Sequence, residues 1–213
     1  MTFESREDAG RQLGLLIREK YPGADLVLGL PRGGVVVAAE VARVLHRRLD
    51  VLVVRKIGHP LQREFAVGAM AEENVVILDE AVIGTTASVR DELSDVIEDE
   101  MRRLKEYERK FRSGPRPDLD GKTVLIVDDG LATGATMEAG VLSARKQGAA
   151  SIVVAVPVAS TNGVARLERV ADAVMALLID PGFDAVGCYY RSFLQTTDEE
   201  VVALLKNAEC APQ

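Results

Sequence analysis

Short apolar runs alternate along this chain with segments in which apolar residues recur every three or four positions. The runs predict strands at 25–30, 50–54, 74–79, 123–128, 151–157 and 173–179. The helical spacing predicts helices at 5–20, 35–48, 88–111, 136–147, 162–170 and 198–207. Strands that alternate with helices are typical of parallel sheets. The pattern therefore predicts an α/β fold with an open, mostly parallel twisted sheet and helices on both faces.

Two segments stand outside this alternation. Residues 55–73 contain Gly58, Pro60 and Gly68, and they predict a loop that we expect to be a mobile lid. Residues 180–213 follow the last strand and predict a small hood or C-terminal appendage. The rest of the pattern fits a single domain over 1–213. The long helix at 88–111 is either a solvated helix on the sheet or a subunit contact, and we expect a homodimer.

Composition narrows the class of protein. The chain has 213 residues, of which 47% are apolar and 28% charged, as in globular proteins. The net charge of −7 and the 4% of aromatic residues argue against a nucleic-acid partner. Apolar runs are too short for a membrane span, and the polar start resembles no signal peptide. Cys188 and Cys210 are the only cysteines, so we expect free thiols in a reducing, cytoplasmic location. The two cysteines and two histidines lack the spacing of a zinc site.

The segment 124–136 carries the strongest chemical signal. A predicted buried strand ends at two acids, Asp128 and Asp129, and a loop of small residues, 132–136, then leads into a helix. Backbone N–H groups at such a helix start bind anions, and Gly134 lets the backbone approach closely. The acids suit sugar hydroxyls or a developing positive charge. The alternative, an ordinary helix cap beside two acids, leaves this coincidence of residues unexplained.

Two further loops that follow predicted strands contain arginine, lysine or paired glycines. Pro31-Arg32-Gly33-Gly34 suggests a second anion site, although a plain turn has the same composition. Arg55 and Lys56 place two cations before the predicted lid, although they could equally be surface cations. Ligands of open parallel sheets bind beyond the carboxyl ends of the strands. Together the loops describe a ligand with a phosphate at one end, hydroxyls in the middle and a second anionic group.

The order of apolar residues, two acids, two further residues and a small-Thr-Gly-x-Thr loop resembles the signature of type I phosphoribosyltransferases. These enzymes use 5-phosphoribosyl-1-pyrophosphate (PRPP). The resemblance covers residues 25–180 and implies the fold of that family with a variable hood. It implies that the 5-phosphate is bound by Ala132, Thr133, Gly134, Ala135 and Thr136. It further implies that pyrophosphate is bound by Arg32, Gly33, Lys56 and Arg55.

The resemblance also implies the reaction. Asp128 and Asp129 would contact the ribose hydroxyls and act in catalysis while a nitrogen nucleophile displaces pyrophosphate. Mg²⁺ would be the cofactor, held mainly by substrate oxygens and waters, with Asp128 or Asp129 as the candidate protein contact. Both substrates would be small molecules of nucleotide metabolism. A non-catalytic PRPP-binding regulator is the alternative. A response-regulator receiver is disfavoured, because the strand at 151–160 contains no Asp.

The acceptor is encoded less clearly. Ala132 stands where 6-oxopurine enzymes of the family carry an acid, so the signature is closer to the adenine type. A general base would then come from elsewhere, with Glu64, Glu72 and Glu73 as candidates. Tyr189, Tyr190 and Phe193 are the hood aromatics that we expect to stack on a nucleobase, although ordinary packing of an appendage also explains them.

Overall fold

The main sheet of the molecule has five parallel strands. The computed structural model describes residues 2–79, 87–112 and 114–209. The strand order is β2-β1-β6-β7-β8, and every neighbouring pair is parallel. The bounds are β1 Leu26–Gly29, β2 Arg48–Val51, β6 Thr123–Val127, β7 Ser151–Ser160 and β8 Ala173–Asp180. The α/β fold predicted from the alternating pattern is therefore confirmed.

Helices cover both faces of this sheet because alternate residues of its central strands point in opposite directions. Leu125 packs in one apolar cluster with helices α1, α2 and α7, whereas Ile126 packs in the other with α5 and α6. The helices are α1 Arg6–Lys20, α2 Gly33–Leu45, α5 Ala135–Lys146, α6 Thr161–Leu167 and α7 Asp198–Glu209. Ser5 caps α1 by accepting a hydrogen bond from the backbone N–H of Asp8.

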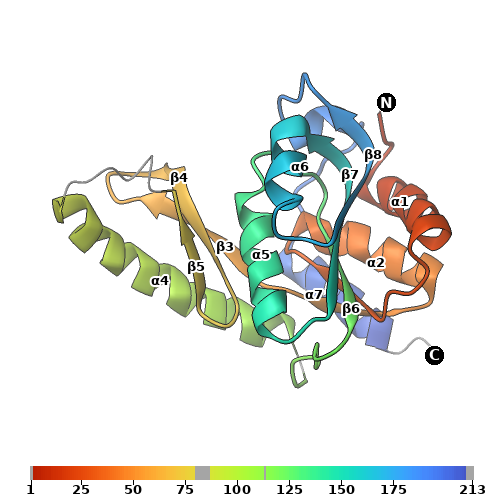
Figure 1. Cartoon of the computed structure of the whole chain (residues 1–213), viewed down its shortest axis with the longest axis horizontal. Coiled ribbons are helices and arrows are strands. Elements are labelled where there is room, and N and C mark those ends of the chain that lie inside the picture. The colour runs from red at the N-terminus through yellow and green to blue at the C-terminus, as the bar shows by residue number, and fades with distance from the viewer. Residues whose placement is uncertain (1, 80–86, 113, 210–213) are drawn as a thin grey trace.

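A second, antiparallel sheet stands to one side of the first, with a long helix along it (Figure 1). Its elements are β3 Val54–His59, β4 Gln62–Ala71 and β5 Val75–Leu78, and the helix is α4 Ala87–Phe111. Residues 55–73 are therefore mostly strand, and the predicted loop is wrong in this respect. Gly58 lies at a register shift, and a Cβ at Gly68 would come within 2.4 Å of the Ile77 carbonyl. These glycines mark a bulge and a close approach within strands.

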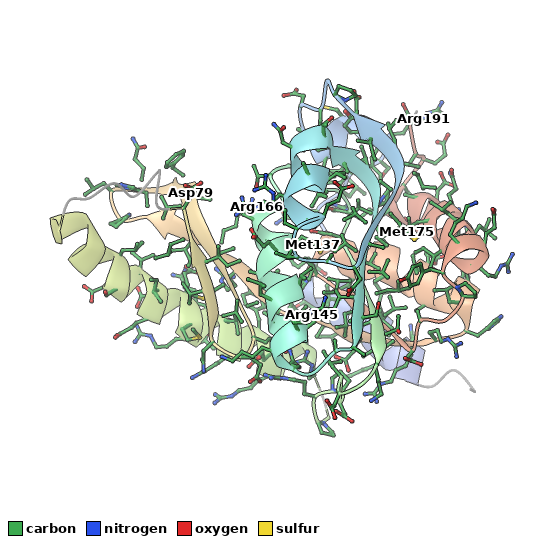
Figure 2. All side chains as sticks on the ribbon, in the orientation of Figure 1. Asp79, Met137, Arg145, Arg166, Met175 and Arg191 are labelled. Carbon is green, nitrogen blue, oxygen red and sulfur yellow. The ribbon has the colours of Figure 1, made fainter. Side chains whose placement is uncertain are left out.

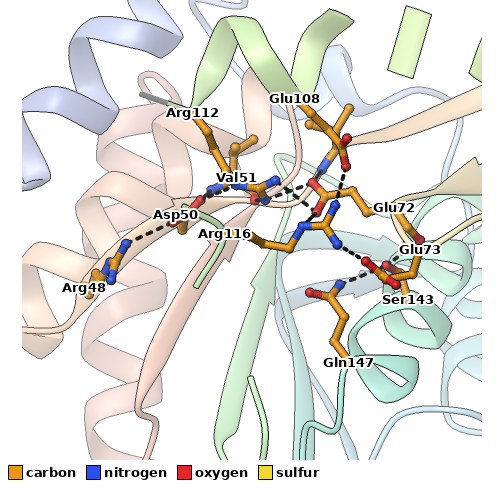
Figure 3. A network of polar contacts seen from close by, with 11 residues as sticks. Arg48, Asp50, Val51, Glu72, Glu73, Glu108, Arg112, Arg116, Ser143 and Gln147 are labelled. Carbon is orange, nitrogen blue, oxygen red and sulfur yellow. Dashed lines mark hydrogen bonds and ion pairs between the residues drawn. The ribbon is translucent and has the colours of Figure 1, made fainter. Parts of the chain in front are cut away.

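A buried charge cluster of Arg112, Arg116, Asp50 and Glu72 joins the small sheet to the main body (Figure 3). The Glu72 carboxylate is inaccessible to solvent and accepts hydrogen bonds from Arg112 at 2.9 and 3.1 Å and from the Val53 N–H at 2.7 Å. Arg112 also contacts Asp50 at 3.0 Å, and Arg116 contacts Glu72 at 3.1 Å. Burial raises the pKa of Glu72, and Arg112 opposes that rise.

Two of the three candidates for a general base, Glu72 and Glu73, take part in this charge cluster. Glu72 is held by two arginines, and Glu73 pairs with Arg116. Both carboxylates therefore belong to the junction between the sheets. The side chain of Glu64 lies outside the described residues.

Candidate active site

The turn at 31–34 lies directly on the two acids that end β6. Leu30 donates its N–H to the Val127 carbonyl at 2.9 Å, so the turn leaves β1 beside the point where β6 ends. A Cβ at Gly33 would lie 2.1 Å from Asp129 Oδ2, and one at Gly34 would lie 2.6 Å from Asp128 Oδ1. A Cβ at Gly34 would also come within 2.8 Å of the Asp128 backbone, so glycine is required there, whereas one at Gly33 would displace the side chains of Asp129 and Arg6. The structure thus brings the first two predicted loops together.

Asp128 and Asp129 form an unusual pair of carboxyl groups. Burial raises the pKa of Asp128 well above its ordinary range, and the neighbouring Asp129 carboxylate raises it further. Burial also raises the pKa of Asp129, against the opposing charge of Arg6. Lys56 from β3 lies close enough to lower the pKa of Asp128, which brings the third predicted loop to the site. Hydroxyl donors or a cation placed here would stabilise the ionised pair.

Arg6 is a site residue that the sequence analysis missed. Its Nε donates to Asp129 Oδ2 at 2.7 Å, and its Nη1 donates to the Leu194 carbonyl at 2.7 Å. The guanidinium carbon stands 3.8 Å from the centroid of the Phe193 ring. The only sequence signal is a cation in the first turn of a helix, where acids are preferred.

The loop at 132–136 has the form expected of an anion site. Gly134 takes the left-handed conformation, with φ of 78°, at the N-cap of α5. Among the described residues, no side chain caps this helix, so its first N–H groups face the loop without a side-chain acceptor. Ser160 donates its hydroxyl to the Ala132 carbonyl at 2.5 Å. Arg166 of α6 pairs with Glu138 of α5, which ties the two helices beside the loop (Figure 2).

The predicted pyrophosphate cations lie in different surroundings. Arg32 Nη1 is 3.8 Å from Asp198 Oδ1 at the start of α7. Arg55 Nε contacts Glu100 at 2.5 Å, and its guanidinium lies 5.3 Å from the centroid of the Tyr107 ring, so the side chain packs against α4. Neighbouring residues of a strand point to opposite sides. Arg55 therefore faces the long helix, and Lys56, its neighbour on the strand, is the residue whose charge acts on Asp128.

The aromatic residues of the hood divide into two groups. Tyr190 donates its hydroxyl to the backbone carbonyl of Asp129 at 2.6 Å and packs 5.1 Å from Phe193, centroid to centroid. Tyr189 instead stacks on Phe183 and donates to Asp180 at 2.7 Å, which raises the pKa of Tyr189 to about 12. Tyr190 and Phe193 lie beside the acids, whereas Tyr189 belongs to the packing of the hood.

The donor set of the site suits a hard cation. Two carboxylates stand together at the strand end, and burial raises the pKa of each, so nearby positive charge would stabilise their ionised forms. Within residues 2–79, 87–112 and 114–209, no group of three or more His, Cys, Asp or Glu residues is arranged to hold a metal. An ion at Asp128 and Asp129 would need oxygens from water and substrate, which is the coordination that Mg²⁺ prefers.

Comparisons with known proteins identify the family. The family model of the phosphoribosyl transferase domain matches residues 16–190, and the chain belongs to this family. Two proteins of Mycobacterium tuberculosis, from strains CDC 1551 and H37Rv, are 45% identical over 207 residues, and their names assign phosphoribosyl transferase provisionally. The match covers 97% of this chain and 47% of theirs. The chain thus spans about half the length of these curated relatives.

Solved structures agree with this assignment. The crystal structure of TT1426 from Thermus thermophilus has 43% sequence identity and a TM-score of 0.81, and the match covers 97% of this chain and 99% of that one. The purine phosphoribosyltransferase of Pyrococcus horikoshii has 18% identity and a TM-score of 0.50, and the match covers 90% of this chain and 93% of that one. This second likeness concerns the fold alone. The fold of type I phosphoribosyltransferases and the resemblance found in residues 124–136 are both confirmed.

Among residues 2–79, 87–112 and 114–209, no helix combines the length and the apolar character needed to cross a bilayer.

Proposed function

We propose that this protein transfers phosphoribose from PRPP to a nitrogen of a small, nucleobase-like acceptor and releases pyrophosphate. One observation carries the proposal. The glycine turn at 31–34, Lys56 and the start of α5 all meet around Asp128 and Asp129. These are the parts that a doubly phosphorylated sugar requires, because its two anionic ends need donors and its hydroxyls need acceptors.

The two ends of the donor would be held differently. The loop at 132–136 offers backbone N–H groups at a helix N-terminus, which suit a terminal phosphate monoester. The turn at Gly33 lies against Asp129 and the charge of Lys56 acts on Asp128, so these two parts suit pyrophosphate. Arg32 would exchange its contact with Asp198 for one with the leaving group. We further propose that the β3–β4 hairpin, which carries Lys56, closes over the bound donor as a lid.

The acid pair would act on the sugar. Ionised Asp128 and Asp129 would accept hydrogen bonds from the ribose hydroxyls and stabilise the positive charge that develops on the ring as pyrophosphate leaves. Mg²⁺, when bound with the donor, would supply positive charge that stabilises the departing pyrophosphate. Asp128 and Asp129 are the side chains that would hold this ion, directly or through water.

The acceptor would enter from the hood. Phe193 is 39% exposed and lies beside Arg6 and Tyr190, so its ring is the best placed of the three predicted aromatics to contact a flat base. Ala132 brings no acid near the acceptor, which favours an acceptor of the adenine type. The cytoplasmic location and the homodimer also stay predictions, and gel filtration tests the second.

A pyrophosphate-release screen tests the proposal. The protein is assayed with Mg²⁺, PRPP and a panel of purines and pyrimidines, and PRPP binding is measured separately by calorimetry. We expect Asp128→Asn and Asp129→Asn each to lower kcat by about 100-fold and to weaken PRPP binding much less, because their charge acts mainly in the transition state. Binding without release for every acceptor would favour a PRPP-binding regulator. An absence of PRPP binding would refute both functions.

A further inference from the structure

We propose that Arg6 is a positioning residue of the active site, which fixes the carboxylate of Asp129 and joins it to the hood. This inference rests on the proposed function, because it assigns Asp129 to the reacting sugar. It concerns a residue far from the phosphoribosyltransferase signature and outside the segment that the family model matches.

The guanidinium of Arg6 is held in three directions. One side donates to Asp129 Oδ2, another donates to the Leu194 carbonyl, and one face lies on the Phe193 ring. The Arg6 side chain is only 11% exposed, and that of Asp129 only 16%. A planar guanidinium with this many partners has little rotational freedom. It therefore presents a fixed charge to Asp129.

The ion pair is also packed against the glycine turn. A Cβ at Gly33 would lie 2.6 Å from Arg6 Nε and 2.1 Å from Asp129 Oδ2. The backbone of the predicted pyrophosphate turn thus forms one wall around the pair. Movement of the Arg6 side chain would release the Asp129 carboxylate from this wall, so three distant parts of the chain depend on one another here.

Arg6 leaves half of the Asp129 carboxylate for substrate. The pair uses Oδ2, and Tyr190 holds the same residue through its backbone carbonyl at 2.6 Å. Oδ1 can then accept a ribose hydroxyl or face a bound cation. Without Arg6 the carboxylate could rotate about its last bond, and both oxygens would lose their fixed orientation. Orientation of this kind is a large part of enzymatic rate enhancement.

The charges around Asp128 and Asp129 distinguish Arg6 from the other residues of the site. The charged groups that act on the acid pair are Arg6 from α1 and Lys56 from β3, together with the two acids themselves. Arg6 is the cation that also hydrogen-bonds to Asp129, at 2.7 Å, so it fixes the direction of that carboxylate as well as its surroundings. An oriented carboxylate acts mainly in the transition state, so loss of Arg6 should lower kcat more than it changes KM.

The experiment compares the wild-type chain with Arg6→Met, Arg6→Lys and Arg11→Met. Arg11 lies on the same helix and is 50% exposed, with ion pairs at the surface, so Arg11→Met is the matched control. Pyrophosphate release is measured over a range of PRPP concentrations, which separates kcat from KM. We expect Arg6→Met to lower kcat about tenfold and to change KM for PRPP by less than about threefold. Arg6→Lys should recover part of the lost rate, because the charge is kept but the planar fork of donors is not.

One readout does not need turnover. A crystal structure of Arg6→Met should show the Asp129 carboxylate rotated away from the direction that its contact with Arg6 Nε gives it in the wild type. A kcat equal to that of Arg11→Met, or an unmoved Asp129 carboxylate in the Arg6→Met crystal, would overturn the inference. A wild type that binds PRPP but releases no pyrophosphate would instead count against the proposed function, and the crystal structure would still decide the role of Arg6.

Discussion

Arg112→Met should destabilise the protein strongly at neutral pH. Arg112 is 10% exposed and bridges Asp50 and Glu72, and the Glu72 carboxylate has no solvent exposure (Figure 3). Methionine keeps much of the side-chain volume and removes the charge. Glu72 would keep Arg116 at 3.1 Å and the Val53 N–H at 2.7 Å, but it would lose both hydrogen bonds from Arg112.

The expected loss follows from what remains around Glu72. Removal of one partner from a buried ion pair costs about 3–5 kcal/mol, because the other charge stays buried. Since Arg116 still opposes the charge, we expect the lower end, about 3 kcal/mol. For a chain of this size that corresponds to a fall in Tm of roughly 6–12 °C. The control is Arg102→Met on α4, where the arginine is 74% exposed and its ion pair should contribute less than about 1 kcal/mol.

The loss should depend on pH in a definite direction. Burial already raises the folded-state pKa of Glu72 above its ordinary value of 4.5, and loss of Arg112 raises it further. A raised folded-state pKa contributes stability at low pH, and that contribution is lost as the pH rises through the folded-state pKa. The difference between Arg112→Met and the wild type should therefore be smaller at about pH 5 than at about pH 8.

Urea unfolding at these two pH values measures the effect. Adding Glu72→Gln to Arg112→Met should recover part of the stability at about pH 8, because a neutral amide replaces the unpaired charge. A loss below about 1 kcal/mol at about pH 8 would refute the reasoning. So would an equal loss at both pH values together with no recovery in the double variant.

Two further predictions concern the glycines of the site. Gly33→Ala should lower kcat/KM by at least about tenfold in the pyrophosphate-release assay, because its Cβ would collide with the Asp129 carboxylate. Gly23→Ala, where nothing lies within 4 Å, should leave the activity unchanged, and equal activities would contradict the prediction. Thr133→Ala combined with Gly134→Val should abolish PRPP binding by calorimetry while the circular dichroism spectrum stays that of a folded protein. Retained affinity for PRPP would contradict the proposal that the loop at 132–136 binds the 5-phosphate.

Most of the main sheet could be predicted because its central strands are buried on both faces. Strand β7 is apolar from Ile152 to Ala159, and such runs are visible without any knowledge of the fold. Strands β3 and β4 were missed because Gly58, Pro60 and Gly68 are also the residues of loops. Their roles as bulge, turn and close approach depend on the partner strand, which the local sequence does not reveal.

The same distinction explains which site residues could be found. Asp128 to Thr136 lie in one continuous segment, so their spacing is visible in the sequence. Arg6 pairs with an acid 123 positions away, and that pairing exists only after folding. Arg55 and Lys56 are neighbours, and their opposite directions follow only when the segment is recognised as strand.

The hood is closed by residues from opposite ends of the described chain, and this has a consequence for synthesis of the protein on the ribosome. The N–H of Phe3 donates to the Tyr189 carbonyl at 2.8 Å, and Arg191 returns a hydrogen bond to the Phe3 carbonyl at 2.8 Å. A nascent chain that has already emerged through α6 carries every predicted phosphate-binding loop and the helices that support it, yet the partners of Phe3 are still missing. We therefore expect affinity for the sugar donor to arise before the hood aromatics are in place. The binding site of a growing chain would stay open on the hood side until translation passes Arg191.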